Sequence, residues 1–308
     1  MNRRDLLRSA GLAAAALTLR APLAACSREQ AADGRRRGGP DQERLARWSE
    51  SLRAEGLVSP DALLGRAAVR VGELAAGTPY EAHTLEAYLR DQGGAAATEP
   101  LTLSLTRFDC VTLVEACLAV ARASAGGAAS WERFGREVER MRYRGGLRRG
   151  YASRLHYFSE WIEDGERRGL VKDLGRKFGG VEDERPLRFM TSHRDSYLAL
   201  ADDAVFREIS EIERRLDDSP RYVIPTARIP EVADGIETGD VLAFATGIEG
   251  LDVTHSAFAY RDDANTLRVL HAPLSGGVVE VTARTLPEYV AAIRRSIGIL
   301  VARPKWAP

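Results

Sequence analysis

Hydrophobic positions recur with a helical period over most of the chain up to about residue 234. Between residues 43 and 76, apolar residues return every three or four positions and predict two helices, the second starting at Ser59-Pro60-Asp61. The segment from Asp109 to Val120 is apolar on nearly every side, which predicts a helix buried inside the domain, with Asp109 as its N-cap. Residues 131–140, 153–168 and 196–216 combine many charges with an apolar stripe and predict further helices.

The last third of the chain has the period of β-strands. Short β-rich runs separated by Gly, Asp and Asn turns predict an antiparallel meander over residues 236–245, 253–260, 267–271 and 277–281, with 296–301 as a closing strand. The alternating segment 100–105 predicts one more strand, which leads into the buried helix. These patterns predict one α+β domain over residues 43–308, with a large helical insertion at about 128–234 and a β-rich part at 235–308.

The first 42 residues have the composition of an export signal and a linker. A basic start with Arg3-Arg4 precedes an apolar run too short to span a bilayer, which indicates a twin-arginine signal over residues 1–26. The run ends in Leu23-Ala-Ala-Cys26, which resembles a bacterial lipobox with Cys26 lipidated; an ordinary cleaved signal is the alternative. Residues 27–42 lack aromatic and β-branched residues, as flexible tethers do. We therefore expect an exported lipoprotein of the periplasm or cell envelope, held to a membrane through Cys26.

Charge and ligand spacing exclude several classes of function. The chain has 44 basic and 44 acidic residues, so it lacks the positive excess of proteins that bind nucleic acids. Its five histidines show no H-E-x-x-H or similar spacing, so we expect neither a metal nor another cofactor. The basic run from Arg142 to Arg149 has two interpretations, a surface that faces an acidic substrate or a solvated loop.

Cys110 is the strongest candidate for a reactive residue, because it falls in the first turn of the buried helix. Unpaired backbone N–H groups and the positive end of the helix dipole favour a thiolate there, so we expect a lowered pKa and donors for an oxyanion. The alternative is a small buried apolar residue. Cys117, two turns further on, is predicted to be structural and to lie too far from Cys110 for a disulfide. Two unpaired thiols in an exported protein favour a chemical role for one of them.

His255 and His271 are the candidates for the base that a cysteine nucleophile needs. His255 begins an alternating strand that places Ala257 on the same face and Ser256 on the other. His271 ends the following strand, so antiparallel pairing brings the two imidazoles side by side at one end of the sheet. A cysteine with two imidazoles supplies a nucleophile, a base and a group that orients the base.

Several motifs together resemble the NlpC-type cysteine peptidases of bacterial cell-wall metabolism. They are Gly77-Thr-Pro-Tyr80, Phe108-Asp-Cys110, the segment TGDVLAF at 238–244, His255 with its strand, and LHAPLSGGV at 270–278. Segments 77–86, 108–115 and 153–162 resemble more closely the N-acetylmuramoyl-L-alanine amidase-like branch, of which the helical insertion is characteristic. The resemblance implies a circularly permuted papain-like core, with the nucleophile helix packed on an antiparallel sheet.

The resemblance also implies roles for single residues. Cys110 corresponds to the nucleophile, His255 to the base and His271 to its orienter, while Tyr80 faces the thiol and, with Asp109, belongs to the oxyanion or substrate side.

The insertion contributes Arg154, His156 and Tyr157 as candidates for the substrate cleft, with His156 expected on a helix. His83 stands where the family has a small residue, which leaves the pocket beside Tyr80 unspecified.

The expected function is hydrolysis of an amide in peptidoglycan or its muropeptide fragments through an acyl-enzyme. The branch favours the N-acetylmuramoyl-L-alanine bond, and the alternative is the γ-D-glutamyl-diamino acid bond cut by NlpC-type endopeptidases. A further alternative is an envelope-binding lipoprotein that keeps the fold without catalysis.

Overall fold

Helices form in most of the segments where the apolar period predicts them. The computed structural model describes residues 39–59, 61–91, 95–274 and 277–306. The α-helices in this part of the chain are α2 (Pro40–Ala54), α3 (Leu64–Leu74), α4 (Ala87–Asp91), α5 (Cys110–Ala125), α6 (Trp131–Arg142), α7 (Phe158–Arg167), α8 (Phe189–Ser192), α9 (Asp203–Leu216), α10 (Ile229–Val232) and α11 (Leu286–Ala292). Within these residues, every helix is too short or too polar to cross a membrane. Helix α2 begins at Pro40, so the last three residues of the predicted tether are helical, whereas the export signal with Cys26 lies outside the described residues.

The strands form one antiparallel sheet. They are β1 (Val171–Asp173), β2 (Val181–Glu182), β3 (Tyr222–Pro225), β4 (Val241–Thr246), β5 (Val253–Arg261), β6 (Leu267–His271), β7 (Glu280–Val281) and β8 (Ser296–Pro304). Their order is β2-β3-β8-β4-β5-β6-β7, with β1 also paired to β8, so the predicted meander is confirmed as β4 to β7. Strand β8 lies inside the sheet, where Ile299 pairs with Ile224 of β3 on one side and Phe244 of β4 on the other.

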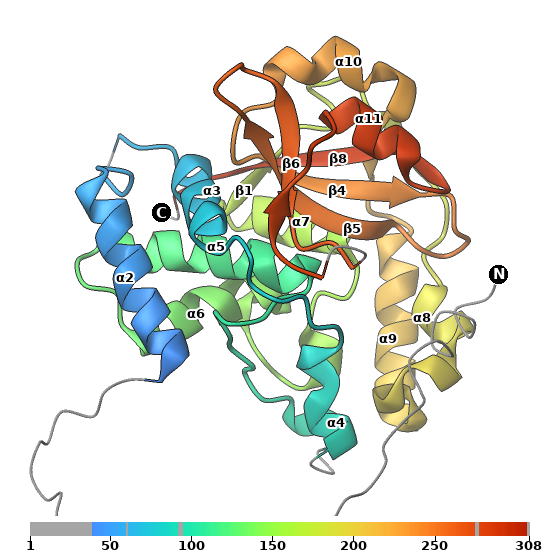
Figure 1. Cartoon of the computed structure of the whole chain (residues 1–308). Helices are drawn as coiled ribbons and strands as arrows, with labels where there is room; N and C mark the ends of the chain where they lie inside the picture. The colour runs from blue at the N-terminus through green and yellow to red at the C-terminus, as the bar shows by residue number, and fades with distance from the viewer. Residues whose placement is uncertain (1–38, 60, 92–94, 275–276, 307–308) are drawn as a thin grey trace, which may run out of the picture. The chain divides into compact units, whose positions relative to one another are not determined.

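Alternation along the strands divides the core between the two faces of the sheet. On one face, Val241 and Ala243 of β4 belong to the apolar cluster that contains α2, α3, α5 and α6. On the other face, Leu242 and Phe244 pack with α10 and α11. Figure 1 shows these two groups of helices on opposite sides of the strands. Helix α5 lies at the centre of the first cluster, and its residues 113–124 are all buried. The predicted α+β class and the all-round burial of the cysteine helix are therefore confirmed.

The insertion is less helical than the sequence predicts. Strands β1, β2 and β3 come from the predicted insertion and join the sheet, β1 and β3 by pairing with β8. The helix predicted from residue 153 begins only at Phe158, because residues 151–153 form a 3-10 turn and Arg154 pairs in extended conformation with Tyr143. Residues 198–201 form another 3-10 turn before α9.

The strand predicted at residues 100–105 is wrong. The segment joins no strand of the described sheet: the Thr102 N–H donates to the Pro100 carbonyl at 3.1 Å in a tight turn, and side chains take up other backbone groups. The Asp41 carboxylate accepts the Leu105 N–H at 2.6 Å, and Arg44 donates to the Leu105 carbonyl at 2.9 Å. Arg142 donates to the carbonyl of Thr102 at 2.6 Å. With these partners the segment needs no neighbouring strand to satisfy its polar backbone.

Candidate active site

Cys110 is the first residue of α5, and the start of that helix is fixed by a reciprocal cap. The Asp109 carboxylate accepts the Thr112 N–H at 2.7 Å, and the Thr112 hydroxyl accepts the Asp109 N–H at 2.9 Å. This box satisfies two of the donors that a helix start leaves free. Cys110 is partly exposed, whereas Cys117 is buried, and neither is in a disulfide. The predicted N-cap and the predicted separation of the two thiols are confirmed.

The surroundings of the Cys110 thiol differ from the prediction. Burial, and secondarily the charge of Asp109, raise the pKa of Cys110 to about 11, although the backbone N–H and hydroxyl of Ser256 approach the sulfur and lower the pKa in part. The expected lowering by the helix start is therefore wrong. Loss of water around the sulfur outweighs the hydrogen bonds from Ser256 and from the Val111 backbone, so the resting residue is a neutral thiol.

This raised pKa predicts how the thiol reacts. We expect alkylation of Cys110 by iodoacetamide to be slow near neutral pH and still to accelerate between about pH 8 and about pH 10, because only the thiolate reacts. The measurement uses a Cys117→Ala background, in which Cys110 is the remaining thiol of the described residues. A rate already at its plateau near neutral pH would reveal a preformed thiolate–imidazolium pair and contradict this expectation.

His255 and His271 meet at one end of the sheet, as the strand pattern predicts. Nε2 of His255 lies 2.8 Å from Nδ1 of His271. His255 stacks on Phe244 of β4, and His271 is almost completely buried, with 1% of its surface exposed. Burial lowers the pKa of His255 to about 3, with the neighbouring His271 contributing, and lowers the pKa of His271 to about 4. Both imidazoles are therefore neutral at physiological pH, which is the form that accepts a proton.

Tyr289 is a site residue that the sequence analysis missed. Its hydroxyl lies 3.3 Å from Nδ1 of His271, and its ring meets the imidazole edge to face. It belongs to α11, which was not predicted although Thr285 and Glu288 form a capping box around Pro287. That Thr-x-x-Glu spacing, with Pro just inside the helix, is a local start signal.

Cys110 and the histidine pair share neighbours on two sides. Ser256, which approaches the sulfur, directly follows His255 on β5. Burial, and secondarily Cys110 once it is ionised at high pH, raise the pKa of Tyr289 to about 12. Tyr289 in turn contacts His271. Cys110 is therefore connected to the histidine pair through Ser256 and Tyr289, and direct proton transfer between Cys110 and His255 remains a prediction.

Tyr80 lies beside the cysteine. Its backbone N–H donates to the Gly277 carbonyl at 2.7 Å, and it forms a bridge with Phe108, two residues before Cys110. Burial raises the pKa of Tyr80 to about 12, and Cys110 adds to the shift once it is ionised at high pH. The hydroxyl therefore keeps its proton at physiological pH. His83 lies nearby in the sequence but is exposed, with a positive φ of 62°.

Arg154 is held inside the insertion by two acidic residues. It is 8% exposed, its Nη2 lies 3.4 Å from Glu86, and its Nε lies 3.2 Å from Glu99. The pKa of Arg154 stays above its ordinary value because these carboxylates outweigh the cost of burial. The guanidinium joins the segment after Tyr80 to the insertion, and its contact with a substrate remains a prediction.

His156 and Tyr157 also make contacts within the insertion. Nε2 of His156 lies 2.8 Å from the Tyr151 carbonyl, and burial holds the pKa of His156 well below its ordinary value. The Tyr157 hydroxyl donates to Glu213 of α9 at 2.6 Å. His156 precedes α7, so its predicted place on a helix is wrong. Tyr157 is fully enclosed, with 2% exposure.

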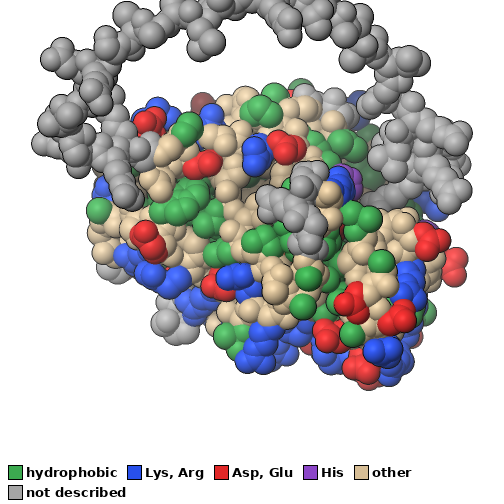
Figure 2. All heavy atoms as spheres, turned by 90° about the horizontal axis from the view of Figure 1, so that it is seen from below, with side chains coloured by type: hydrophobic (Ala, Val, Ile, Leu, Met, Phe, Trp, Pro, Cys, Tyr) green, Lys and Arg blue, Asp and Glu red, His purple; other side chains and the backbone are tan. Residues whose placement is uncertain are grey.

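The basic run at residues 142–149 is largely neutralised by the protein itself. Arg142 pairs with Glu115, Arg144 with Glu160, and Arg148 with Glu139. Figure 2 likewise shows basic and acidic side chains interspersed over the face that it presents. These pairings favour the interpretation of the run as a structural and solvated segment.

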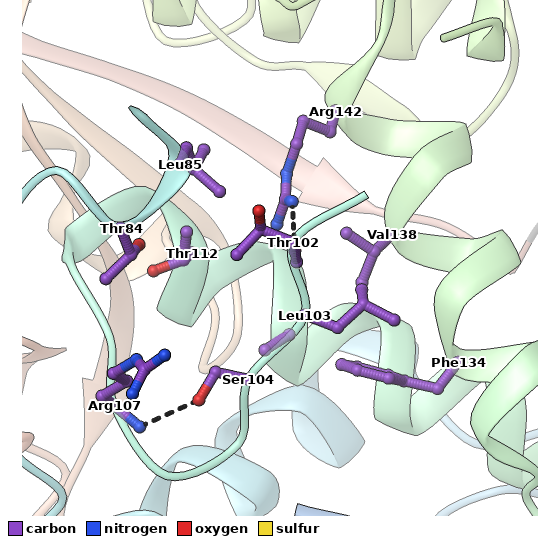
Figure 3. A pocket seen from close by; sticks show the side chains of 11 residues that line it. Thr84, Leu85, Thr102, Leu103, Ser104, Arg107, Thr112, Phe134, Val138 and Arg142 are labelled. Carbon is purple, nitrogen blue, oxygen red and sulfur yellow. Dashed lines mark hydrogen bonds between the residues drawn. The ribbon is translucent and has the colours of Figure 1, made fainter. Parts of the chain in front are cut away.

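A small pocket lies beside the start of α5, where Thr112 and Ala116 line it. Its walls come from the 3-10 turn η1 (Thr84–Glu86), the segment 102–107 and facing sides of α5 and α6 (Figure 3). Arg142 closes one wall, where it donates to Thr102. Cys110, His255 and His271 do not line this pocket, so it is distinct from the candidate site. In the described residues, no group of three His, Cys, Asp or Glu side chains is placed to hold a metal ion.

Comparison with known proteins identifies the family. A family model described as N-acetylmuramoyl-L-alanine amidase-like matches residues 70–299. The crystal structure of an N-acetylmuramoyl-L-alanine amidase from Bacteroides uniformis is similar, with 31% identity and a TM-score of 0.71 over 79% of this chain and 99% of that one. A structure from Bacteroides fragilis, whose name assigns it provisionally to the xylanases, has 31% identity and a TM-score of 0.68 over 76% and 99% of the two chains.

A protein from Legionella pneumophila, at 19% identity and a TM-score of 0.62 over 87% of this chain and 94% of that one, shares the fold. None of the curated proteins matches. The family match over residues 70–299 and the 31% identity to the Bacteroides uniformis amidase show that the chain belongs to the N-acetylmuramoyl-L-alanine amidase-like family.

Proposed function

We propose that the protein is a cysteine-dependent hydrolase that cleaves the amide bond between N-acetylmuramic acid and L-alanine in peptidoglycan or muropeptides. Family membership supports a hydrolase that acts on peptidoglycan. The observation that carries the cysteine mechanism is the 2.8 Å contact between His255 and His271, a pair that shares the neighbours Ser256 and Tyr289 with the helix-start Cys110. A pair of neutral imidazoles and a thiol at a helix start supply the base and the nucleophile that catalysis by cysteine requires.

In this proposal His255 acts first as a base and then as an acid. It takes the Cys110 proton while the sulfur attacks the amide carbonyl, and the carbonyl π electrons move onto oxygen. When the tetrahedral intermediate collapses, the C–N bond breaks and the amine of L-alanine leaves with the proton held by His255. Water then gives a proton to His255 and adds to the thioester carbonyl; the C–S bond breaks, His255 returns the proton to the Cys110 sulfur, and the carboxylic acid is released. A raised thiol pKa fits this order, because the thiolate forms together with the bond to carbon.

The oxyanion would be stabilised by groups at the start of α5 and by Tyr80. The backbone N–H groups of the first helical turn point toward a developing negative charge. Tyr80 keeps its proton because its pKa is raised to about 12, so its hydroxyl remains a donor. Asp109 contributes as the cap that orients this turn, since its carboxylate is engaged by Thr112.

We also propose that the core is the circularly permuted papain-like core of NlpC-type peptidases. The packing of α5 against β5, with the histidines on β5 and β6, supports this assignment. The parts of the insertion that add strands to the sheet edge would then be an elaboration of that core.

The scissile bond is tested by mass spectrometry of products from a defined muropeptide. We expect release of the free amino sugar together with the intact stem peptide that begins with L-alanine. A product in which the sugar keeps L-alanine and D-glutamate would instead assign the γ-D-glutamyl endopeptidase activity and remove the amidase proposal.

We further propose that the mature protein is a lipoprotein of the cell envelope anchored through Cys26, as the segment ending in Leu23-Ala-Ala-Cys26 indicates. Replacing Cys26 with Ser should move the protein from the membrane fraction to the soluble fraction of the envelope. An unchanged membrane fraction in this variant would contradict the anchor.

A further inference from the structure

Nδ1 of His271 has two neighbours and a single bonding position. Nε2 of His255 lies at 2.8 Å and the hydroxyl of Tyr289 at 3.3 Å. In a neutral imidazole this nitrogen carries either one lone pair, which two donors can only share, or one proton, which it donates mainly to the nearer neighbour. The two states are tautomers of His271, and they differ in what they leave on His255.

The tautomer of His271 decides whether His255 is basic. If Nδ1 of His271 accepts, His255 donates through Nε2–H and keeps its lone pair on Nδ1, where it can take up the proton of Cys110. If Nδ1 of His271 is protonated, its N–H donates a hydrogen bond to Nε2 of His255, whose lone pair is then occupied. His255 then carries its own proton on Nδ1 and has no free lone pair for the thiol.

Two groups from different elements favour the first state. The Tyr289 hydroxyl lies 3.3 Å from Nδ1 of His271, and because a phenol is a stronger hydrogen-bond donor than acceptor, it favours a lone pair on that nitrogen. On the other side of the ring, Nε2 of His271 lies 3.9 Å from a carboxylate oxygen of Glu280 on β7. That nitrogen is buried without a hydrogen-bond partner among the described residues, so the nearby negative charge favours a proton on it.

We infer that Tyr289 is a positioning residue, whose hydroxyl holds the proton of His271 on Nε2 and thereby leaves Nδ1 of His255 free to act as the base. The inference rests on the proposed function, because the lone pair on Nδ1 of His255 is needed as a base only in a cysteine mechanism. It extends the site from β5 and β6 to α11 on the same side of the sheet. Charged and titratable groups around His271 come from each neighbouring element: His255 on β5, Glu280 on β7 and Tyr289 on α11.

The test replaces Tyr289 with Phe, which removes only the hydroxyl. The matched control is Tyr222→Phe, whose hydroxyl bonds Glu182 at the exposed edge of the sheet. Nitrogen-15 NMR of the histidine side chains, recorded at neutral pH without substrate, reports the tautomers. We expect His271 protonated on Nε2 in the wild-type protein and in the control, and a measurable population protonated on Nδ1 in Tyr289→Phe.

Kinetics with the muropeptide provide the second measurement. We expect kcat of Tyr289→Phe to fall about five- to tenfold, the factor that corresponds to one hydrogen bond of ordinary strength, with KM nearly unchanged. A His271 tautomer that Tyr289→Phe leaves unchanged, or a shifted tautomer with unchanged kcat, would overturn the inference. The NMR measurement needs no turnover, so it tests the tautomer of His271 independently of the proposed function. The proposed function is tested separately, because a Cys110→Ala variant that keeps its activity would contradict it.

Discussion

Replacing Cys110 with Ala should lower turnover of a muropeptide by at least about 10³-fold, because the reaction loses its covalent nucleophile. The substitution removes one sulfur atom at a partly exposed position, so the helix start and its Asp109 cap should stay intact. Turnover is measured by liquid chromatography and mass spectrometry of the released stem peptide, with circular dichroism to confirm the fold.

The control for this substitution lies on the same helix. Cys117→Ala removes a sulfur atom that is 1% exposed and two turns from the site, so we expect stability to fall slightly and turnover to stay near the wild-type value. Equal turnover in Cys110→Ala and in the wild-type protein would defeat the cysteine mechanism. No turnover by the wild-type protein on any muropeptide would favour the envelope-binding alternative.

Replacing Arg142 with Met should lower the free energy of unfolding by about 3–5 kcal/mol, the cost of leaving a buried charge without its partner. Nε of Arg142 donates to Glu115 of α5 at 2.7 Å, and the two side chains are 5% and 2% exposed. Arg142 also holds the Thr102 carbonyl. Urea denaturation followed by tryptophan fluorescence measures the change.

The decrease in the free energy of unfolding caused by Arg142→Met should depend on pH. Burial already raises the pKa of Glu115 against the opposing effect of Arg142, and the pKa should rise further when the arginine is gone. A carboxyl with a raised pKa in the folded state costs stability as the pH rises, so the variant should lose less at pH 5 than at about pH 8.

An exposed pair provides the comparison. Arg70→Met breaks the pair with Glu55, whose side chains are 33% and 38% exposed, and should cost at most about 1 kcal/mol. If Arg142→Met costs no more than Arg70→Met at about pH 8, the buried pair contributes no more to stability than an exposed one, and the expectation is wrong.

The sequence allows prediction of those parts of the site that depend on local pattern. The capping box at Asp109 is a local motif, and the two-residue period of β5 places His255 and Ser256 on opposite faces. Antiparallel pairing of neighbouring strands is the commonest connection, which brings His271 to His255. These features need no knowledge of distant segments.

The parts that could not be predicted depend on burial and on distant contacts. The pKa of Cys110 rises because water is excluded around the sulfur, which a helix-dipole argument from sequence does not include. Tyr289 meets His271 only once α11 has packed on the sheet, although the capping box of α11 could have been found. The segment 100–105 alternates like a strand, but Asp41 binds its backbone instead.

Strand β8 has a consequence for how the protein folds. Ile299 lies between Ile224 and Phe244, so the sheet stays divided until a segment made late in the chain enters between two that precede it. Contacts of such long sequence separation slow folding. Until β8 enters, β4 exposes an unpaired edge, at which the folding chain can aggregate. A chaperone, or rapid collapse around α5, would have to limit this aggregation.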